Sequence, residues 1–243
     1  MILARIALYL DIEFATSEKS VLAIMEKGSV NRKDAILEDY RTRGKWEIRH
    51  FENQTRCIAT SFIRSLGHYR NEDTKKINIM CTKEEKHKRI STVLDICEVH
   101  MKFDYDEYMT GSLLEKKRLI LETIMLAVRK VADSKKWDIE PFEKVYEQII
   151  EANYVSEWVW KKPKQSPDRK HKAKLFLQHE LDEITMSIIV TDNKGNELKR
   201  ETIITEQPDE WEYSGHLGEL KWLDNETVAL FHKYNNEKKC LHI

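Results

Sequence analysis

Two helical patterns stand side by side in the middle of this 243-residue chain, and strand-like patterns lie before and after them. Strands and helices that occur in separate runs are typical of α+β folds, whereas regular βαβ units alternate them. We therefore predict an α+β protein with mostly antiparallel sheets, a central two-helix hairpin at about 112–153 and a C-terminal β-meander.

The ends of the two central helices are marked in the sequence. Ser112 and Glu115 have the spacing of a capping box, and Pro141 falls in the first turn of a second helix that starts near Asp138. The connection between the helices is only a few residues long, so we expect them to pack as an antiparallel hairpin. The apolar side chains that define the first helix are Leu114, Leu121, Met125, Val128 and Val131.

Strand patterns dominate the rest of the chain. Residues 4–14 alternate between apolar and polar, residues 46–51 and 56–63 look like a hairpin, and residues 77–82 look like a short strand. The sharpest alternation is at residues 97–105. Each of these segments is predicted to bury one face in a sheet.

A compositional break separates the two halves of the chain. Residues 161–174 contain seven Lys or Arg, one Asp and two of the four prolines, which predicts a basic loop or linker. It would join an α+β domain at 1–160 to an acidic antiparallel β region at 175–243, either as a second domain or as part of the same one.

Composition excludes several classes of protein. The chain has 7 glycines, where an average protein of this length has about 17, so glycine-rich phosphate loops and nucleophile elbows are disfavoured. With 41% hydrophobic and 34% charged residues it is neither a disordered tail nor a membrane protein. A net charge of −1 argues against a generic nucleic-acid coat.

The sequence predicts a cytoplasmic protein without cofactors. Its longest apolar run near the N-terminus has five residues, 6–10, with no cleavage site after it. The cysteines, at 57, 81, 97 and 240, lack the spacing of metal or redox pairs, so we expect free thiols packed as small hydrophobic residues.

One strand face has a pattern that metal-dependent nucleases use. Carboxylates there bind a divalent ion while a lysine steadies the phosphate or the attacking water. This is the alternative enzymatic reading, a divalent-metal nuclease or phosphodiesterase, and an exposed strand with alternating charges would look the same. The residues concerned are Glu98, His100, Lys102, Asp104 and Asp106.

A second candidate site lies in the acidic C-terminal region. Residues 180–226 contain 13 Asp or Glu but only four Lys or Arg, and large aromatic residues are interleaved with the acids. Aromatic anchors bordered by carboxylates suit a surface that binds a basic partner. Burial of the rings in an acidic sheet is the competing explanation. The candidate binding residues are Asp209, Glu210, Trp211, Glu212, Tyr213, Trp222 and Asp224.

These features favour a binding protein over an enzyme. We expect an inhibitor, antitoxin or immunity-type protein that occludes a basic protein partner, possibly a nuclease, with its acidic C-terminal sheet. Contact with nucleic acid through residues 161–174 is a lesser possibility, and no metal, cofactor or membrane partner is expected.

Overall fold

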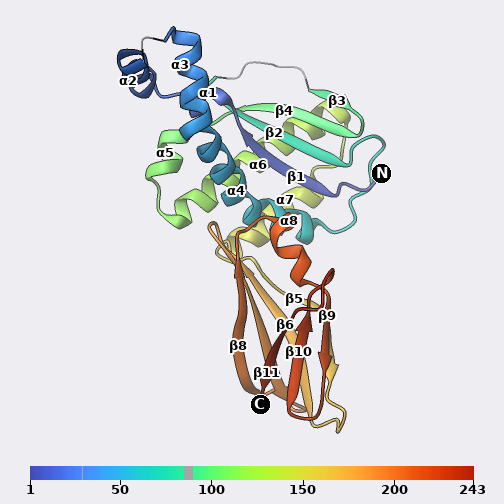
Figure 1. The fold of residues 1–243 in the computed structure, drawn as a ribbon. Helices are drawn as coiled ribbons and strands as arrows, with labels where there is room; N and C mark the ends of the chain where they lie inside the picture. The colour runs from blue at the N-terminus through green and yellow to red at the C-terminus, as the bar shows by residue number, and fades with distance from the viewer. Residues whose placement is uncertain (29, 85–89) are drawn as a thin grey trace. The chain divides into compact units, whose positions relative to one another are not determined.

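The computed structural model describes residues 1–28, 30–84 and 90–243, which form two compact units, Met1–Val155 and Ser156–Ile243 (Figure 1). The first unit contains a mixed sheet with helices, and the second contains two antiparallel sheets. The chain is therefore an α+β protein, as predicted.

The first unit is built on a four-stranded sheet in the order β1-β2-β4-β3. Strand β1 pairs in parallel with β2, β2 pairs in parallel with β4, and β3 runs antiparallel to β4. In this register Leu8 lies opposite Ile79, and Ile79 lies opposite Val99, so one face of the sheet is apolar and buried. The strands are β1 (Arg5–Leu10), β2 (Lys76–Thr82), β3 (Ser91–Val93) and β4 (Ile96–Lys102).

Helices complete the first unit. Helix α4 contacts β1, α6 and α7, while α6 contacts β4, and Figure 1 shows α6 passing behind the sheet. The helical segments are α1 (Ile12–Ala15), α2 (Glu18–Gly28), α3 (Arg32–Asp39), the π-helix η1 (Tyr40–Gly44), α4 (Lys45–Leu66), α5 (Tyr105–Thr110), α6 (Leu113–Lys135) and α7 (Glu140–Glu151).

The prediction of mostly antiparallel sheets is wrong for this first sheet. Residues 46–51 and 56–63 do not form a hairpin, because both lie within the single helix α4. A helical crossover returns the chain to the start of the sheet, so the strand that follows pairs in parallel, whereas a tight hairpin would force antiparallel pairing.

Burial explains why α4 is a helix. Phe51, Ile58 and Phe62 are buried at helical spacing. Two polar residues between the expected strands, Asn53 and Gln54, are buried as well, and Gln54 accepts a hydrogen bond of 2.7 Å from the Tyr108 hydroxyl. Tertiary contacts thus outweigh the turn preference of the central residues of this segment.

Two predicted strands end earlier than their alternation suggested. Strand β1 stops at Leu10 because Asp11 caps α1 through the Glu13 N–H. Strand β4 stops at Lys102, since the next acidic residue, Asp104, caps α5. Both caps replace the end of a predicted strand with a helix.

The central helical hairpin is confirmed. Ser112 and Glu115 form a reciprocal capping box at the start of α6, and Pro141 lies in the first turn of α7. Lys136 ends α6 in the left-handed conformation, and an ion pair of 3.2 Å joins Arg129 on α6 to Glu143 on α7. The short connection therefore produces the expected pair of packed helices.

The second unit is formed by two antiparallel sheets. The first has the order β5-β6-β7-β8, which is a meander, and the second has the order β11-β10-β9. Buried apolar side chains from both sheets form one core, including Leu175, Ile188, Trp222 and Leu230. The elements are β5 (Glu157–Gln165), β6 (His171–His179), β7 (Ile184–Asp192), β8 (Glu197–Glu206), α8 (Glu210–Tyr213), the 3₁₀ helix η2 (Ser214–His216), β9 (Glu219–Trp222), β10 (Thr227–Phe231) and β11 (Lys238–His242).

The basic segment 161–174 is not a loop or linker. It comprises the end of β5, a turn at 166–170 and the start of β6, with Lys164 paired to Ala173. A bulge between Trp160 and Lys164 accommodates Pro163, which a regular ladder in the sheet interior would reject. The segment belongs to the second unit.

The four cysteines are free thiols, as expected from their spacing. Cys57, Cys81 and Cys97 are buried thiols, and Cys240 is half-buried. Within residues 1–28, 30–84 and 90–243, each helix is too short or too polar to cross a membrane.

Candidate functional site

The strand residues proposed for metal chemistry are only partly brought together. Glu98, His100 and Lys102 lie on one face of β4, opposite the buried face formed by Val99 and its neighbours. The Glu98 Oε1 atom lies 3.1 Å from His100 Nε2. Lys102 is exposed at the end of the strand. This part of the candidate set therefore shares a face, as the alternation predicted.

The remaining two carboxylates lie elsewhere. Asp104 accepts the Glu107 N–H at 2.9 Å as the cap of α5, and Asp106 lies in the first turn of that helix. In the described part of the chain, no three His, Cys, Asp or Glu side chains gather as a metal site would require. Because the strand ends at Lys102, its alternation does not extend to these carboxylates.

The most strongly perturbed carboxylate was not singled out by sequence. Burial alone would raise the pKa of Asp39, but hydrogen bonds from the Arg43 guanidinium and the Ser17 N–H outweigh it and lower the pKa to about 2. Arg43 also donates to the Ala15 carbonyl at 2.6 Å and pairs with Glu47 at 2.5 Å. The four-residue spacing of Asp39 and Arg43 is the only signal that sequence reading had for this pair.

This cluster is better explained by structure than by catalysis. The donors of Arg43 are occupied by two carboxylates and a backbone carbonyl, which leaves little for a ligand. Burial and the nearby Glu47 carboxylate raise the pKa of Tyr105 to about 12, so its phenol stays protonated at neutral pH. The cluster of Asp39, Arg43 and Glu47 joins α1, through the Ala15 carbonyl, and the π-helix to the start of α4.

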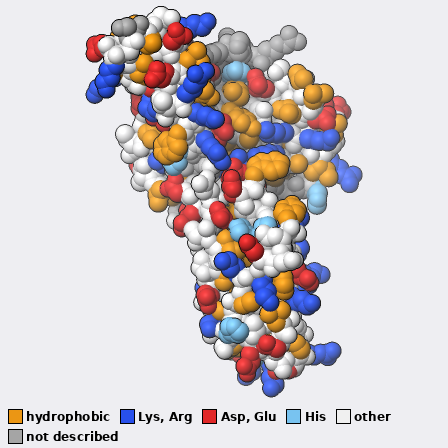
Figure 2. Space-filling view, in the orientation of Figure 1, with side chains coloured by type: hydrophobic (Ala, Val, Ile, Leu, Met, Phe, Trp, Pro, Cys, Tyr) orange, Lys and Arg blue, Asp and Glu red, His pale blue; other side chains and the backbone are white. Residues whose placement is uncertain are grey.

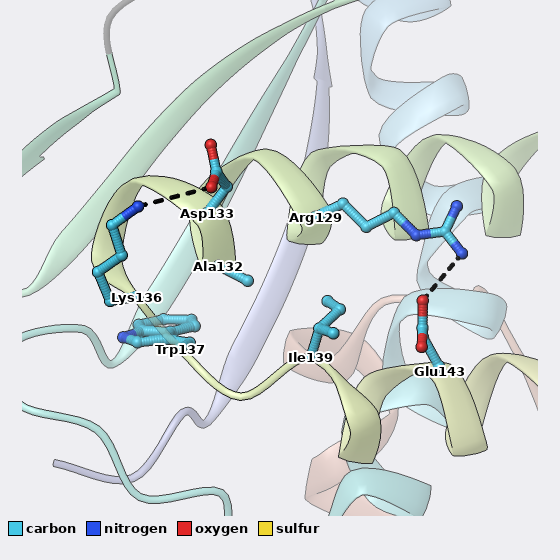
Figure 3. A pocket seen from close by; sticks show the side chains of 7 residues that line it. All are labelled: Arg129, Ala132, Asp133, Lys136, Trp137, Ile139 and Glu143. Carbon is cyan, nitrogen blue, oxygen red and sulfur yellow. Dashed lines mark hydrogen bonds and ion pairs between the residues drawn. The ribbon is translucent and has the colours of Figure 1, made fainter.

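A groove of about 530 Å³ lies between α6 and α7 (Figure 3). Its rim carries two ion pairs, Arg129 with Glu143 and Lys136 with Asp133 at 3.6 Å. Trp137, which stacks on Phe142, supplies part of its apolar wall. The charged groups at this groove are paired with one another.

In the C-terminal cluster, the structure corrects the placement of two rings. Tyr213 is 5% exposed and Trp222 is 7% exposed, and both belong to the core of the second unit. The Trp222 Nε1 donates to the Lys164 carbonyl at 2.9 Å. These two side chains are therefore core residues, because the amphipathic character of Tyr and Trp lets a ring be buried while its polar atom is satisfied.

Trp211 differs from the other two rings. Its side chain is 81% exposed on the short helix α8. Asp209 is nearly buried and caps this helix by accepting the Trp211 N–H at 3.0 Å. Glu210 is half-buried and Glu212 is exposed. The cluster thus presents one aromatic side chain, Trp211, and two exposed acids, Glu212 and Asp224.

Asp224 has a structural role in a turn. It accepts the N–H groups of Glu226 and Thr227 at 2.8 and 2.7 Å, and these hydrogen bonds lower its pKa. Its side chain remains exposed. The carboxylate therefore contributes negative charge to the surface while it fixes the turn before β10.

The chain matches no family model, no curated protein and no solved structure, so its function is argued from these residues alone.

Proposed function

We propose that this chain is a non-enzymatic binding protein of the inhibitor, antitoxin or immunity type, whose second unit occludes a basic protein partner. The observation that carries the proposal is the 81% exposure of Trp211. Tryptophan is the residue type most enriched among the side chains that dominate protein interfaces. An exposed Trp in a monomer gains free energy when a partner covers it.

The backbone around Trp211 is held in place before any partner arrives. Asp209 caps α8 on one side of it, and Tyr213 is buried in the core two residues later. A preformed anchor loses little conformational entropy on binding, which improves affinity without additional contacts. The three central residues of the predicted site thus have distinct roles, with Trp211 as the contact and its neighbours as supports.

The acidic part of the second unit, residues 180–226, supports a basic partner. Of the 13 carboxylates in residues 180–226, nine are exposed. Electrostatic steering depends on the summed field, so carboxylates that pair locally or cap turns still contribute to it. An acidic region of this kind favours encounter with a basic protein.

The alternative, a metal-dependent nuclease, is less well supported. Its five candidate residues are divided between β4 and α5, and the two that touch, Glu98 and His100, form a pair in which only one member is a carboxylate. Divalent cations that assist phosphate chemistry prefer several oxygen ligands. We therefore carry only the binding proposal forward.

The test is isothermal titration of the chain with the purified products of the reading frames that flank its gene. We expect one basic product to bind, and Trp211→Ala to weaken that binding by about 2 kcal/mol or more, which is about 30-fold. The melting temperature should stay unchanged because the Trp211 ring is exposed.

Trp46→Ala is the matched control. Trp46 is also an exposed tryptophan, at 65%, but it lies in the first unit and stacks on His50. Its replacement should leave the affinity unchanged. Equal affinity of wild type and Trp211→Ala, or absence of binding by either flanking product, would contradict the proposal.

A further inference from the structure

The β5–β6 hairpin concentrates positive charge on an ordered element. Residues 161–174 contain seven Lys or Arg against one Asp. Six of these cations are exposed and Lys174 is half-buried. Figure 2 shows Lys and Arg side chains along the margin of the second unit. The exposed cations are Lys161, Lys162, Lys164, Arg169, Lys170 and Lys172.

The backbone that carries these cations is tied to neighbouring turns. The Asp168 N–H donates to Asn225 Oδ1 at 3.1 Å, and Asn193 Nδ2 donates to the Arg169 carbonyl at 2.8 Å. Ser166 is buried and its hydroxyl accepts the His171 N–H at 3.0 Å. The turn is therefore a fixed platform, and binding a ligand there requires little ordering of the backbone.

The carboxylates near this turn are engaged with their own backbone. Asp168 accepts hydrogen bonds from the Ser166 hydroxyl and the Lys170 N–H, and these lower its pKa. Asp192 and Asp224, on the turns that Asn193 and Asn225 belong to, likewise accept N–H groups of their own turns. Backbone dipoles offset part of each negative charge, so the exposed cations dominate this surface.

We propose that the β5–β6 hairpin binds the phosphate backbone of a nucleic-acid duplex without reading its sequence. Exposed lysines and arginines gain affinity by releasing the counterions that surround such a backbone. A protein partner would need an apolar or aromatic anchor. The large exposed hydrophobic side chains of the described chain include none from residues 161–174.

Duplex rather than single-stranded nucleic acid is favoured by the position of the aromatic rings. Unpaired bases bind by stacking on exposed aromatic side chains. The rings that precede the basic segment, Trp158 and Trp160, are only partly exposed and pack against the core of the second unit. Lys161 lies 3.9 Å from the centre of the Trp160 ring and covers it further. Phosphate contacts therefore remain as the available mode of recognition.

A competing explanation applies to part of the segment. Strand β5 is at the edge of its sheet, and lysines, a proline and a bulge at an edge prevent pairing with another sheet. Lys161, Lys162 and Pro163 protect the edge strand in this way, whatever the protein binds. Edge protection does not explain Arg169 and Lys170, which lie in the turn, or Lys172, which lies on β6 and is paired on both sides.

The experiment measures fluorescence anisotropy of labelled 20-base-pair DNA and RNA duplexes of mixed sequence at 50 to 200 mM salt. The test variant replaces the two turn cations and Lys172 of β6 together, R169Q/K170Q/K172Q, and is called the turn variant. We expect binding to weaken about tenfold or more at low salt, and the slope of log K against log salt to fall by about 2 to 3. Comparing the DNA with the RNA duplex decides which source of phosphate is preferred.

The control variant K233Q/K238Q/K239Q removes the same number of charges from exposed lysines of the β10–β11 hairpin. It should keep the wild-type salt slope. A test variant that binds like wild type, or a control that loses as much, overturns the proposal, as does failure of the wild-type chain to bind either duplex at 50 mM salt.

Two further measurements separate duplex binding from the two alternatives, which are binding of an acidic protein and protection of the sheet edge. Poly-glutamate that competes as well as duplex at equal charge would overturn the proposal in favour of an acidic protein. Lys161→Gln with Lys162→Gln should promote self-association and leave the turn's contribution to the salt slope in place. If the Lys161→Gln/Lys162→Gln variant instead abolishes duplex binding while R169Q/K170Q/K172Q does not, the proposed site is wrong.

Discussion

The two units bury polar groups in different ways. In the first unit, buried polar side chains connect segments that are distant in sequence: Asp39 accepts the Ser17 N–H across 22 residues, and Gln54 accepts the Tyr108 hydroxyl across 54. In the second unit, buried Ser166 and Asp209 close a turn and cap a helix within a few residues. Long-range polar pairs therefore add to the apolar core of the first unit, whereas these two buried polar residues of the second unit act locally.

This difference predicts which substitutions damage each unit. A buried ion pair is costly to break, because the partner that remains keeps its charge in a poorly solvated place. An apolar sandwich loses stability mainly when a large core side chain is removed. Four substitutions test how each unit responds, and the first of them has the largest expected effect.

Trp222→Ala should cost the second unit about 3–5 kcal/mol, because the ring is 7% exposed in the core and its Nε1 satisfies the Lys164 carbonyl. Hydrogen exchange followed by mass spectrometry should show lost protection in 156–243 and retained protection in 1–155. Trp222→Phe keeps most of the apolar ring and should cost less. Equal loss of protection in both units would show that they unfold together and would break the comparison.

Asp39→Asn should destabilise the first unit by about 1–2 kcal/mol, because Arg43 loses one of its two carboxylate partners but stays partly exposed and keeps Glu47. The pH dependence sharpens the test. Since folding lowers the pKa of Asp39 from its ordinary 3.8 to about 2, its contribution is present above pH 4 and is lost as pH falls through 2. Denaturant titrations from pH 6 to pH 2 should show a steeper decline for wild type than for the variant.

Glu18→Gln is the exposed counterpart of that change. It removes a 2.7 Å ion pair with Arg32 in which both side chains are more than half exposed, so water screens the pair and the expected loss of stability lies within the error of a denaturant titration. A cost as large as that of Asp39→Asn would contradict the view that burial decides the importance of these pairs.

Gly44→Ala should cost about 1–3 kcal/mol. A methyl group there would lie 2.5 Å from the Ala15 carbonyl oxygen, which belongs to backbone and cannot move freely. Gly28→Ala is the matched control, because its methyl group would meet only Val30 at 3.7 Å. Thermal melts of both variants measure the difference, and equal melting temperatures would show that the α1–α4 contact yields readily.

Alternation and turn chemistry predicted the second unit well. The expected C-terminal β-meander is present: β6 pairs antiparallel with β7, and a turn at Gly195, which has a φ of +92°, joins β7 to β8. In antiparallel meanders the pairing partners are neighbours in sequence, so local patterns contain most of the information. The basic segment was misjudged because its prolines and lysines are also what an edge strand uses.

The first unit shows the limit of local patterns, and so does the candidate site. Whether residues 45–66 form a helix or a hairpin was decided by what Phe51, Gln54 and Phe62 pack against. Local patterns were enough to predict the α+β class, the helical hairpin with its capping box and the antiparallel C-terminal strands, since these depend on neighbours along the chain. Local patterns could not show that β1, β2 and β4 run parallel, or that Trp211 is exposed while Trp222 is buried. Such features depend on contacts between distant segments, and burial of one ring rather than another leaves no trace in local periodicity.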